Sequence, residues 1–315
     1  MEIGGYIEFP HYTGTVYHDK AIALNCARNC LEYVIEAKHI KRMSIPKFLC
    51  GSVGHKCREK NVEVSYYSIG MDLLPKNLKL NSDEWLYLVN YYGQVDNDKI
   101  KVIKKNNNNL IVDNVEAFFQ LPLDGVDTIY TCRKYFGVPD GGYLYTDTFI
   151  ERILEEDKSA EKMRHLLGRF ENTANEFYNN YKENESLFKN LPLKRMSKIT
   201  ANIMRSYDYN EVKTVREKNY IYLHEKLSKY NKLLLKTPIG AFMYPLYVSN
   251  ASDVRKKLQR KKIYIPVLWP DVLKICNESE LEYDMANNIL PLPCDQRYSL
   301  ETMEYIASEV EKCLN

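Results

Sequence analysis

Short apolar segments alternate with helix-like stretches through the first 150 residues, and this alternation restricts the possible folds more than any other feature. Residues 25–39 place apolar side chains on one helical face, and residues 96–105 also favour a helix. Strand-like segments occupy residues 43–49, 62–69, 85–93, the start of 109–119, 126–131 and 141–147. Strands that alternate with helices predict an α/β fold, in which a mostly parallel sheet carries helices on both faces.

The second half of the chain changes character. Residues 148–232 contain long charged, helix-favouring stretches with few breakers, which indicate solvated helices packed on the sheet. After Pro238 and Gly240 we expect a strand at 241–249, a helix at 251–262, an extended segment at 263–270 and a final helix at 299–314 capped by Ser299. We therefore predict a large domain over residues 1–235 and a small α+β domain over residues 236–315.

Composition excludes several classes of protein. Hydrophobic residues make up 45% and charged residues 27% of the chain, as in soluble globular proteins. Lys and Arg number 44 against 42 Asp and Glu, a balance that argues against nucleic-acid binding through bulk charge. No apolar run approaches the roughly 20 residues that cross a membrane. The first residues include an acid and lack the apolar core of a secretory signal, so we expect a cytoplasmic protein with no membrane partner.

The eight cysteines are scattered and contain no C-x-x-C pair. This pattern favours reduced cytosolic thiols over a disulfide framework. Cys50, His55 and Cys57 offer one set of candidate zinc ligands, but their spacing fits no common zinc finger. We therefore predict no bound metal.

Three candidate chemical groups fall near the expected carboxyl ends of strands, where open parallel sheets bind their ligands. Asp113 ends an apolar strand, Lys134 follows another strand by three residues, and residues 25–28 open a helix whose free N–H groups favour a phosphate. Each has an ordinary alternative: a loop anchor, a surface lysine or a simple helix cap. Together they supply what pyridoxal phosphate (PLP) requires, namely an amine, a carboxylate for the pyridine nitrogen and an anion site.

The chain also resembles fold-type-I PLP enzymes, and among them the DegT/StrS-type sugar aminotransferases, over nearly its whole length. The resemblance is most specific around Lys134, which a Gly-Gly turn follows, and near the carboxyl terminus. The segments that carry it are ALNCARNCLEYVI, VNYYGQ, IVDNVEAFF, YTCRKYFGVPDGGYLYT, LKRMSKITANI, VREKNYIYL and ILPLPCDQRYSLETMEYI.

This resemblance implies an aspartate-aminotransferase-like large domain and a homodimer with shared active sites. Lys134 would hold the cofactor as a Schiff base and act as general base and acid, and Asp113 would meet the pyridine nitrogen. The implied cofactor-binding residues are Ala27, Arg28, Asp113, Glu116, Thr131 and Lys134. Lysine at position 134, where histidine would indicate the dehydratase branch, implies transamination. Glutamate is the implied amino donor, and a nucleotide-linked keto sugar is the implied acceptor.

Some positions depart from the family pattern. The phosphate turn reads Cys26-Ala27-Arg28 in place of small and hydroxyl residues, and Glu116 stands where Gln or His is usual. Phe48 and Cys50 both lie where the family places an aromatic residue on the cofactor ring, and Leu193 replaces an asparagine that reaches the partner's phosphate.

These departures leave a second hypothesis open, an aminotransferase fold that has lost turnover and acts as a binding or regulatory partner. A third, cofactor-free carbohydrate chemistry by paired carboxylates, lacks two acids that we can nominate. A dicarboxylic acceptor would need arginine clamps, and we expect the arginines of the charged helical stretches to face solvent. We therefore expect a large, polar, sugar-like acceptor.

Overall fold

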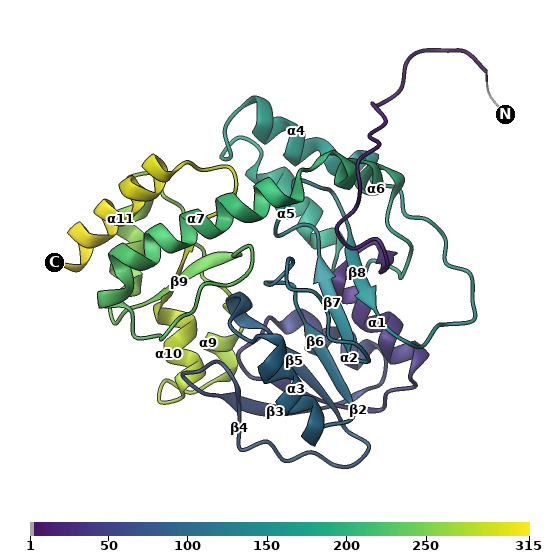
Figure 1. The fold of residues 1–315 in the computed structure, drawn as a ribbon, viewed down its shortest axis with the longest axis horizontal. Helices are drawn as coiled ribbons and strands as arrows, with labels where there is room; N and C mark the ends of the chain where they lie inside the picture. Colours follow the sequence, from purple (N-terminus) through teal and green to yellow (C-terminus); the bar gives the residue numbers. More distant parts are fainter. Residues whose placement is uncertain (1–2) are drawn as a thin grey trace.

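An eight-stranded sheet forms the centre of the molecule in the computed structural model, which describes residues 3–315 (Figure 1). The strands lie in the order β1-β8-β7-β6-β5-β2-β3-β4. The five strands from β7 to β3 are mutually parallel, whereas β1, β8 and β4 pair antiparallel at the edges. Their bounds are Ile22–Leu24 (β1), Arg42–Pro46 (β2), Glu63–Ile69 (β3), Pro75–Lys76 (β4), Trp85–Val89 (β5), Leu110–Asp113 (β6), Asp127–Thr131 (β7) and Gly142–Tyr145 (β8). The predicted mostly parallel sheet is confirmed.

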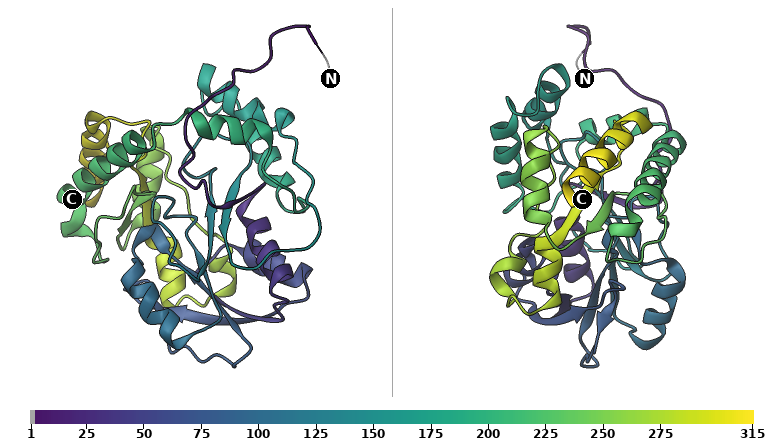
Figure 2. Two further views of the ribbon diagram at one scale, coloured as in Figure 1. Left: turned by 45° about the vertical axis from the view of Figure 1, so that its right-hand side comes forward. Right: turned by 90° about the vertical axis from the view of Figure 1, so that its left-hand side faces the viewer.

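Helices cover both faces of this sheet (Figure 2). α1 (Ala27–Ala37) packs beside α2 (Gly51–Glu59), whereas α3 (Asn97–Asn106) lies on the opposite face. The reason is topological. The chain steps along the sheet in one direction from β2 to β3 and in the other from β5 to β6, and right-handed crossovers then place their helices on opposite faces. The middle of the chain adds α4 (Arg164–Glu171), α5 (Tyr178–Leu187), α6 (Lys198–Ile203) and α7 (Tyr209–Leu227).

A second, two-stranded sheet joins β9 (Met243–Tyr247) to β10 (Ile289–Pro293) in antiparallel register. Around it lie α8 (Ala251–Arg260), α9 (Val272–Ile275), α10 (Leu281–Asn288) and α11 (Leu300–Leu314). Its hydrophobic cluster also takes in Tyr220, Leu223 and Leu227 from the later half of α7. The expected extended segment at 263–270 forms no strand. A small α+β unit therefore follows the main sheet, and its predicted boundary at residue 235 stays a prediction.

The imidazole of His18 lies in the main core, where it is 1% exposed. One ring nitrogen is 2.9 Å from the Phe118 carbonyl oxygen and the other is 3.1 Å from the Tyr145 hydroxyl. The neutral ring satisfies both contacts, since one nitrogen donates to the carbonyl and the other accepts from the phenol. Burial lowers the pKa of His18 from 6.5 to about 4.

This histidine makes stability depend on pH. Because the folded state resists protonation of His18, its contribution is complete above pH 6.5 and is lost as the pH falls toward 4. We expect a His18→Gln variant to lose less free energy of unfolding than the wild type as the pH falls from 6.5 to about 4. The difference should be on the order of 3 kcal/mol. Urea unfolding of both proteins at a series of pH values measures it. Parallel curves for the two proteins would contradict the assignment.

Candidate active site

Lys134 and Glu116 pair beyond the carboxyl ends of β6 and β7, and Asp113, the last residue of β6, lies close enough for both charges to act on its pKa. These strands are parallel neighbours, so the residues that follow them emerge at one edge of the sheet. The Lys134 Nζ atom lies 3.0 Å from Glu116 Oε1. The Lys134 side chain is 33% exposed and that of Glu116 only 1%, so the lysine is partly exposed while its carboxylate partner is buried.

Asp113 is a buried carboxylate whose hydrogen-bond donors are both neutral. The Tyr87 hydroxyl donates to Oδ2 at 2.7 Å, and the Val115 N–H donates to Oδ1 at 3.0 Å. Burial raises the pKa of Asp113, while these two donors and the positive charge of Lys134 oppose that rise. This environment favours a cation placed against the carboxylate, because a buried charge without an opposite charge is costly.

The surroundings of the amine come from distant parts of the chain. The Tyr92 N–H donates to Glu116 Oε2 at 3.1 Å, which leaves Oε1 for the lysine. The ring centroid of Phe242, which immediately precedes β9, lies 5.0 Å from Lys134 Nζ. The long separation in sequence explains why sequence reasoning missed Phe242 at this site.

Helix α1 begins with an uncapped and positively charged turn. Its N-cap residue, Cys26, makes no side-chain capping hydrogen bond. Burial raises the pKa of the Cys26 thiol, while the charges of Arg28, Arg133 and Lys56 act to lower it. The Arg28 Nη1 atom is buried and has no hydrogen-bond partner within residues 3–315. An unsatisfied guanidinium N–H on the first turn of a helix, together with the free N–H groups of that turn, suits an anion.

The Gly141–Gly142 turn joins this helix start to the Lys134 loop. The Gly141 N–H donates to the Asn25 carbonyl at 2.8 Å, and the Gly141 carbonyl accepts from the Cys132 N–H at 3.1 Å. A Cβ atom on Gly142 would lie only 2.8 Å from the Ala27 nitrogen. Glycine at position 142 therefore lets strand β8 approach the α1 start closely.

We expect Gly142→Ala to lower the free energy of unfolding by about 1–3 kcal/mol, because the added methyl group meets backbone atoms that cannot turn away. The displaced α1 start should also weaken phosphate binding. Gly137→Ala is the matched control, because a Cβ there meets only the Tyr207 hydroxyl at 4.0 Å. Urea unfolding checks both variants, and equal stabilities would contradict the close approach.

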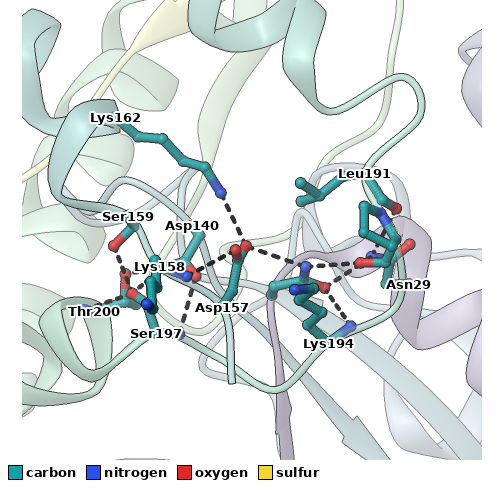
Figure 3. Close-up of polar contacts among 12 residues, drawn as sticks. Asn29, Asp140, Asp157, Lys158, Ser159, Lys162, Leu191, Lys194, Ser197 and Thr200 are labelled. Carbon is teal, nitrogen blue, oxygen red and sulfur yellow. Dashed lines mark hydrogen bonds and ion pairs between the residues drawn. The ribbon is translucent and has the colours of Figure 1, made fainter. Parts of the chain in front are cut away.

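Asp140, immediately before this turn, is anchored by buried hydroxyl groups (Figure 3). Its carboxylate accepts hydrogen bonds from the Ser197 N–H at 3.0 Å, from the Ser197 hydroxyl at 2.8 Å and from the Thr200 hydroxyl. Burial raises the pKa of Asp140 and these donors oppose the rise. The start of α6 thus holds Asp140, the residue that precedes the glycine turn.

Further polar contacts nearby hold Asn25, the residue before the α1 cap. Its amide nitrogen donates to Asp157 Oδ2 at 3.2 Å and to the Pro192 carbonyl at 3.0 Å, and its oxygen accepts from Asn29 at 2.7 Å. Asp157 is in turn paired with Lys162 at 2.9 Å. Asn25 therefore orients the helix start through segments more than 130 residues away.

Four further residues that the sequence analysis singled out take ordinary structural places. Thr131 ends β7 opposite Gly142 of β8, and Leu193 is buried in the main core. The ring of Phe48 packs against that of Trp269, with 4.6 Å between the ring centroids, whereas Cys50 is half-buried at the N-cap of α2. The residue that would stack on a cofactor ring stays unassigned between them.

The candidate zinc ligands have other contacts. His55 lies 3.5 Å from Glu59, and the buried Cys57 packs 3.9 Å from the Met43 sulfur. Within the described part of the chain, no three His, Cys, Asp or Glu side chains gather as a metal would require. Nor is any helix of residues 3–315 long and apolar enough to cross a membrane.

Comparison with solved structures identifies the fold. A DegT DnrJ EryC1 StrS aminotransferase from Brucella abortus superposes with a TM-score of 0.63 at 14% identity, over 93% of this chain and 85% of its own. The chain has the fold of the DegT/StrS-type sugar aminotransferases.

Two further structures support the same assignment. A putative sugar aminotransferase from Streptococcus pneumoniae, in its PLP form, gives a TM-score of 0.66 at 14% identity over 94% of this chain and 88% of that one. An aminotransferase of pseudoaminic acid biosynthesis from Helicobacter pylori gives 0.64 at 15% identity, over 93% and 86%. No protein-family model and no curated sequence matches the chain.

Proposed function

We propose that this protein is a PLP-dependent aminotransferase that moves an amino group from glutamate to the keto group of a nucleotide-linked sugar. The observation that carries the proposal is the cluster of Lys134, Glu116 and Asp113 at the carboxyl edge of the sheet, next to the α1 start. The solved structures of this fold include a sugar aminotransferase in PLP and PMP forms, which supports the cofactor and the substrate class.

The residues present fit the cofactor. Lys134 supplies an amine on a partly exposed side chain, and Asp113 supplies a buried carboxylate that has no direct cationic partner among residues 3–315. At the α1 start, the unpartnered Arg28 Nη1 and the N–H groups of Ala27 and Arg28 suit a phosphate, with Thr131 of β7 as a further candidate ligand. Glu116 already holds the lysine in place of the neutral side chain that the family resemblance implies.

PLP, when bound, supplies an electron sink that stabilises a carbanion next to the substrate nitrogen. The chain's own residues then have separate tasks. Asp113 holds a proton on the ring nitrogen, and Lys134 Nζ moves a proton as general base and then general acid. Glu116 Oε1 receives a hydrogen bond from that amine and keeps it directed toward the substrate side. The α1 start binds the phosphate and thereby fixes the position of the cofactor.

A panel of half-reactions tests the substrate class. The purified protein, loaded with PLP, should be yellow and should lose that colour when glutamate is added. Keto sugars on nucleotide carriers should then restore the colour faster than pyruvate or oxaloacetate. Faster recovery with the simple keto acids would refute the sugar acceptor, even with every cofactor residue correct.

The ion pair between Lys134 and Glu116 favours one competing proposal, a protein that keeps the fold and has lost turnover. In that case the buried Glu116 would hold the amine as an ammonium, which cannot form a Schiff base. The same assay separates the two, because a protein without turnover would bind PLP without losing its colour on addition of glutamate.

We also propose a homodimer in the cytoplasm. Exposed apolar side chains belong to α4 and α5 or to nearby parts of the sequence, and they are candidates for a contact with a second copy. These side chains are Phe149, Leu167, Phe170, Tyr178 and Leu187. Sedimentation equilibrium of the purified protein tests the dimer.

A further inference from the structure

Arg216 of α7 is only 1% exposed, and it is among the largest fully buried side chains of residues 3–315. Within residues 3–315, Arg216 forms no ion pair, because Asp295, whose charge acts to raise the pKa of Arg216, pairs directly with Arg297 instead. Burying a guanidinium without a carboxylate is costly unless its N–H groups are well satisfied. The neutral groups that satisfy Arg216 therefore indicate what the residue does.

The acceptors come from both parts of the molecule. Nη2 donates to the carbonyl of Tyr135 at 3.3 Å, Nη1 donates to the carbonyl of Ala241 at 2.8 Å, and Nε donates to Gln296 Oε1 at 2.7 Å. Tyr135 is the neighbour of Lys134 in the chain, whereas Ala241 and Gln296 flank the two strands of the small sheet. One guanidinium thus connects the lysine loop to the small sheet.

Gln296 strengthens the same connection. Its Nε2 donates to the Tyr135 carbonyl at 2.7 Å, so this oxygen accepts two hydrogen bonds, one from each side chain. The Arg216 guanidinium also lies over the Tyr135 ring, 4.4 Å from its centroid. Tyr135, the residue that follows Lys134, is therefore held both at its carbonyl oxygen and at its side chain.

Arg216 also contacts Phe242, the residue whose ring faces Lys134. Arg216 Nη1 lies 3.4 Å from the Phe242 carbonyl, and the Phe242 ring faces the Lys134 amine with 5.0 Å between centroid and Nζ. Both the loop that carries the amine and the ring that faces it thus depend on one buried side chain.

We propose that Arg216, together with Gln296, is a positioning residue that fixes the Lys134 amine by clamping the Tyr135 carbonyl and the Phe242 backbone. The consequence for catalysis rests on the proposed function, whereas the restraint on the lysine loop does not. Other contacts hold the 238–242 segment against the main sheet, since Gly93 and Gly240 lie close to Pro238 and Phe119 respectively. Loss of the clamp should loosen the lysine loop while leaving this packing in place.

The test compares Arg216→Met, Gln296→Leu and Arg216→Lys with Arg255→Met as a matched control. Arg255 is half-buried in α8, far from Lys134 in sequence, and it donates to the Ile289 carbonyl at 3.4 Å. Gln296→Leu guards against a failure of Arg216→Met to fold, because it removes one donor from the Tyr135 carbonyl and leaves the arginine.

The first measurement is amide hydrogen exchange of residues 132–138 in the cofactor-free protein. In this loop the N–H groups of Tyr135 and Phe136 donate to the Cys132 carbonyl. Exchange there should accelerate at least about tenfold in Arg216→Met and Gln296→Leu, less in Arg216→Lys, and not in Arg255→Met. Unchanged exchange in both clamp variants, or equal acceleration across the whole protein, would overturn the proposal.

The second measurement is the steady-state kinetics of the loaded enzyme. Misplacing the amine in Arg216→Met and Gln296→Leu should lower kcat by up to about 10²-fold with little change in KM. The kcat of Arg216→Lys should be reduced less than that of Arg216→Met. A change confined to KM would overturn the catalytic consequence. Borohydride reduction of the wild-type protein keeps the two proposals distinct: an adduct on another lysine refutes the proposed role of Lys134, while the exchange result still decides whether the clamp restrains the loop.

Discussion

Replacing Lys134 with alanine should abolish both the covalent attachment of PLP and amino transfer. A positioned acid–base group contributes about 10²–10⁴-fold to a rate, and Lys134 carries the attachment in addition, so we expect a loss of at least about 10⁴-fold. Borohydride reduction followed by peptide mass analysis should find the adduct on Lys134 in the wild-type protein. It should find none at this position in the variant.

The variant should remain folded, which makes the loss informative. Removing the amine leaves Glu116 buried without its cation, so a moderate loss of stability is expected. Lys38→Ala is a matched control, because Lys38 also pairs with a buried carboxylate, that of Asp127 at 3.0 Å, but lies away from the site. A Lys134→Ala protein that still transfers amino groups at a rate near that of the control would refute the assignment.

The positions of Lys134 and Asp113 could be predicted because buried parallel strands have a clear pattern in sequence. Strand β6 is buried at every position, as its continuous apolar run indicated, and the residue at its end lies at the ligand-binding edge. Helix α2 was missed because two glycines in nine residues disfavour a helix, and burial of Val53 and Cys57 overrides that preference.

The surroundings of the lysine could not be predicted, because they depend on contacts between distant segments. Arg216 lies in a charged helical stretch, where we expected solvent exposure; this expectation is wrong, since it is 1% exposed. Arg216 can be buried because its guanidinium donates to carbonyl groups that lie up to 81 residues away in sequence. The residues around Arg216 in the sequence give no sign of these partners. The same is true of Phe242 beside the amine and of Tyr87 beside Asp113.

Asp113→Asn should separate catalysis from stability. We expect turnover to fall by roughly 10²–10³-fold, the effect of removing one preorganised electrostatic partner, because a neutral amide cannot hold a proton on the ring nitrogen. Tyr87→Phe is the comparison. It removes one hydrogen bond to Asp113 but leaves the carboxylate, so its loss of turnover should be much smaller.

The cofactor-free Asp113→Asn protein should at the same time be more stable than wild type at neutral pH. Burial raises the pKa of Asp113 above 3.8, so the folded state holds this proton more tightly than the unfolded chain. Ionisation therefore costs folding free energy as the pH rises through the raised pKa, and asparagine avoids that cost. Its amide can still satisfy both neighbours, accepting from the Val115 N–H while the Tyr87 hydroxyl turns to accept. The gain, measured by urea unfolding, should vanish below about pH 3.8. A variant that is less stable than wild type at neutral pH, or one with near-normal turnover, would show that Asp113 serves the fold and not the cofactor.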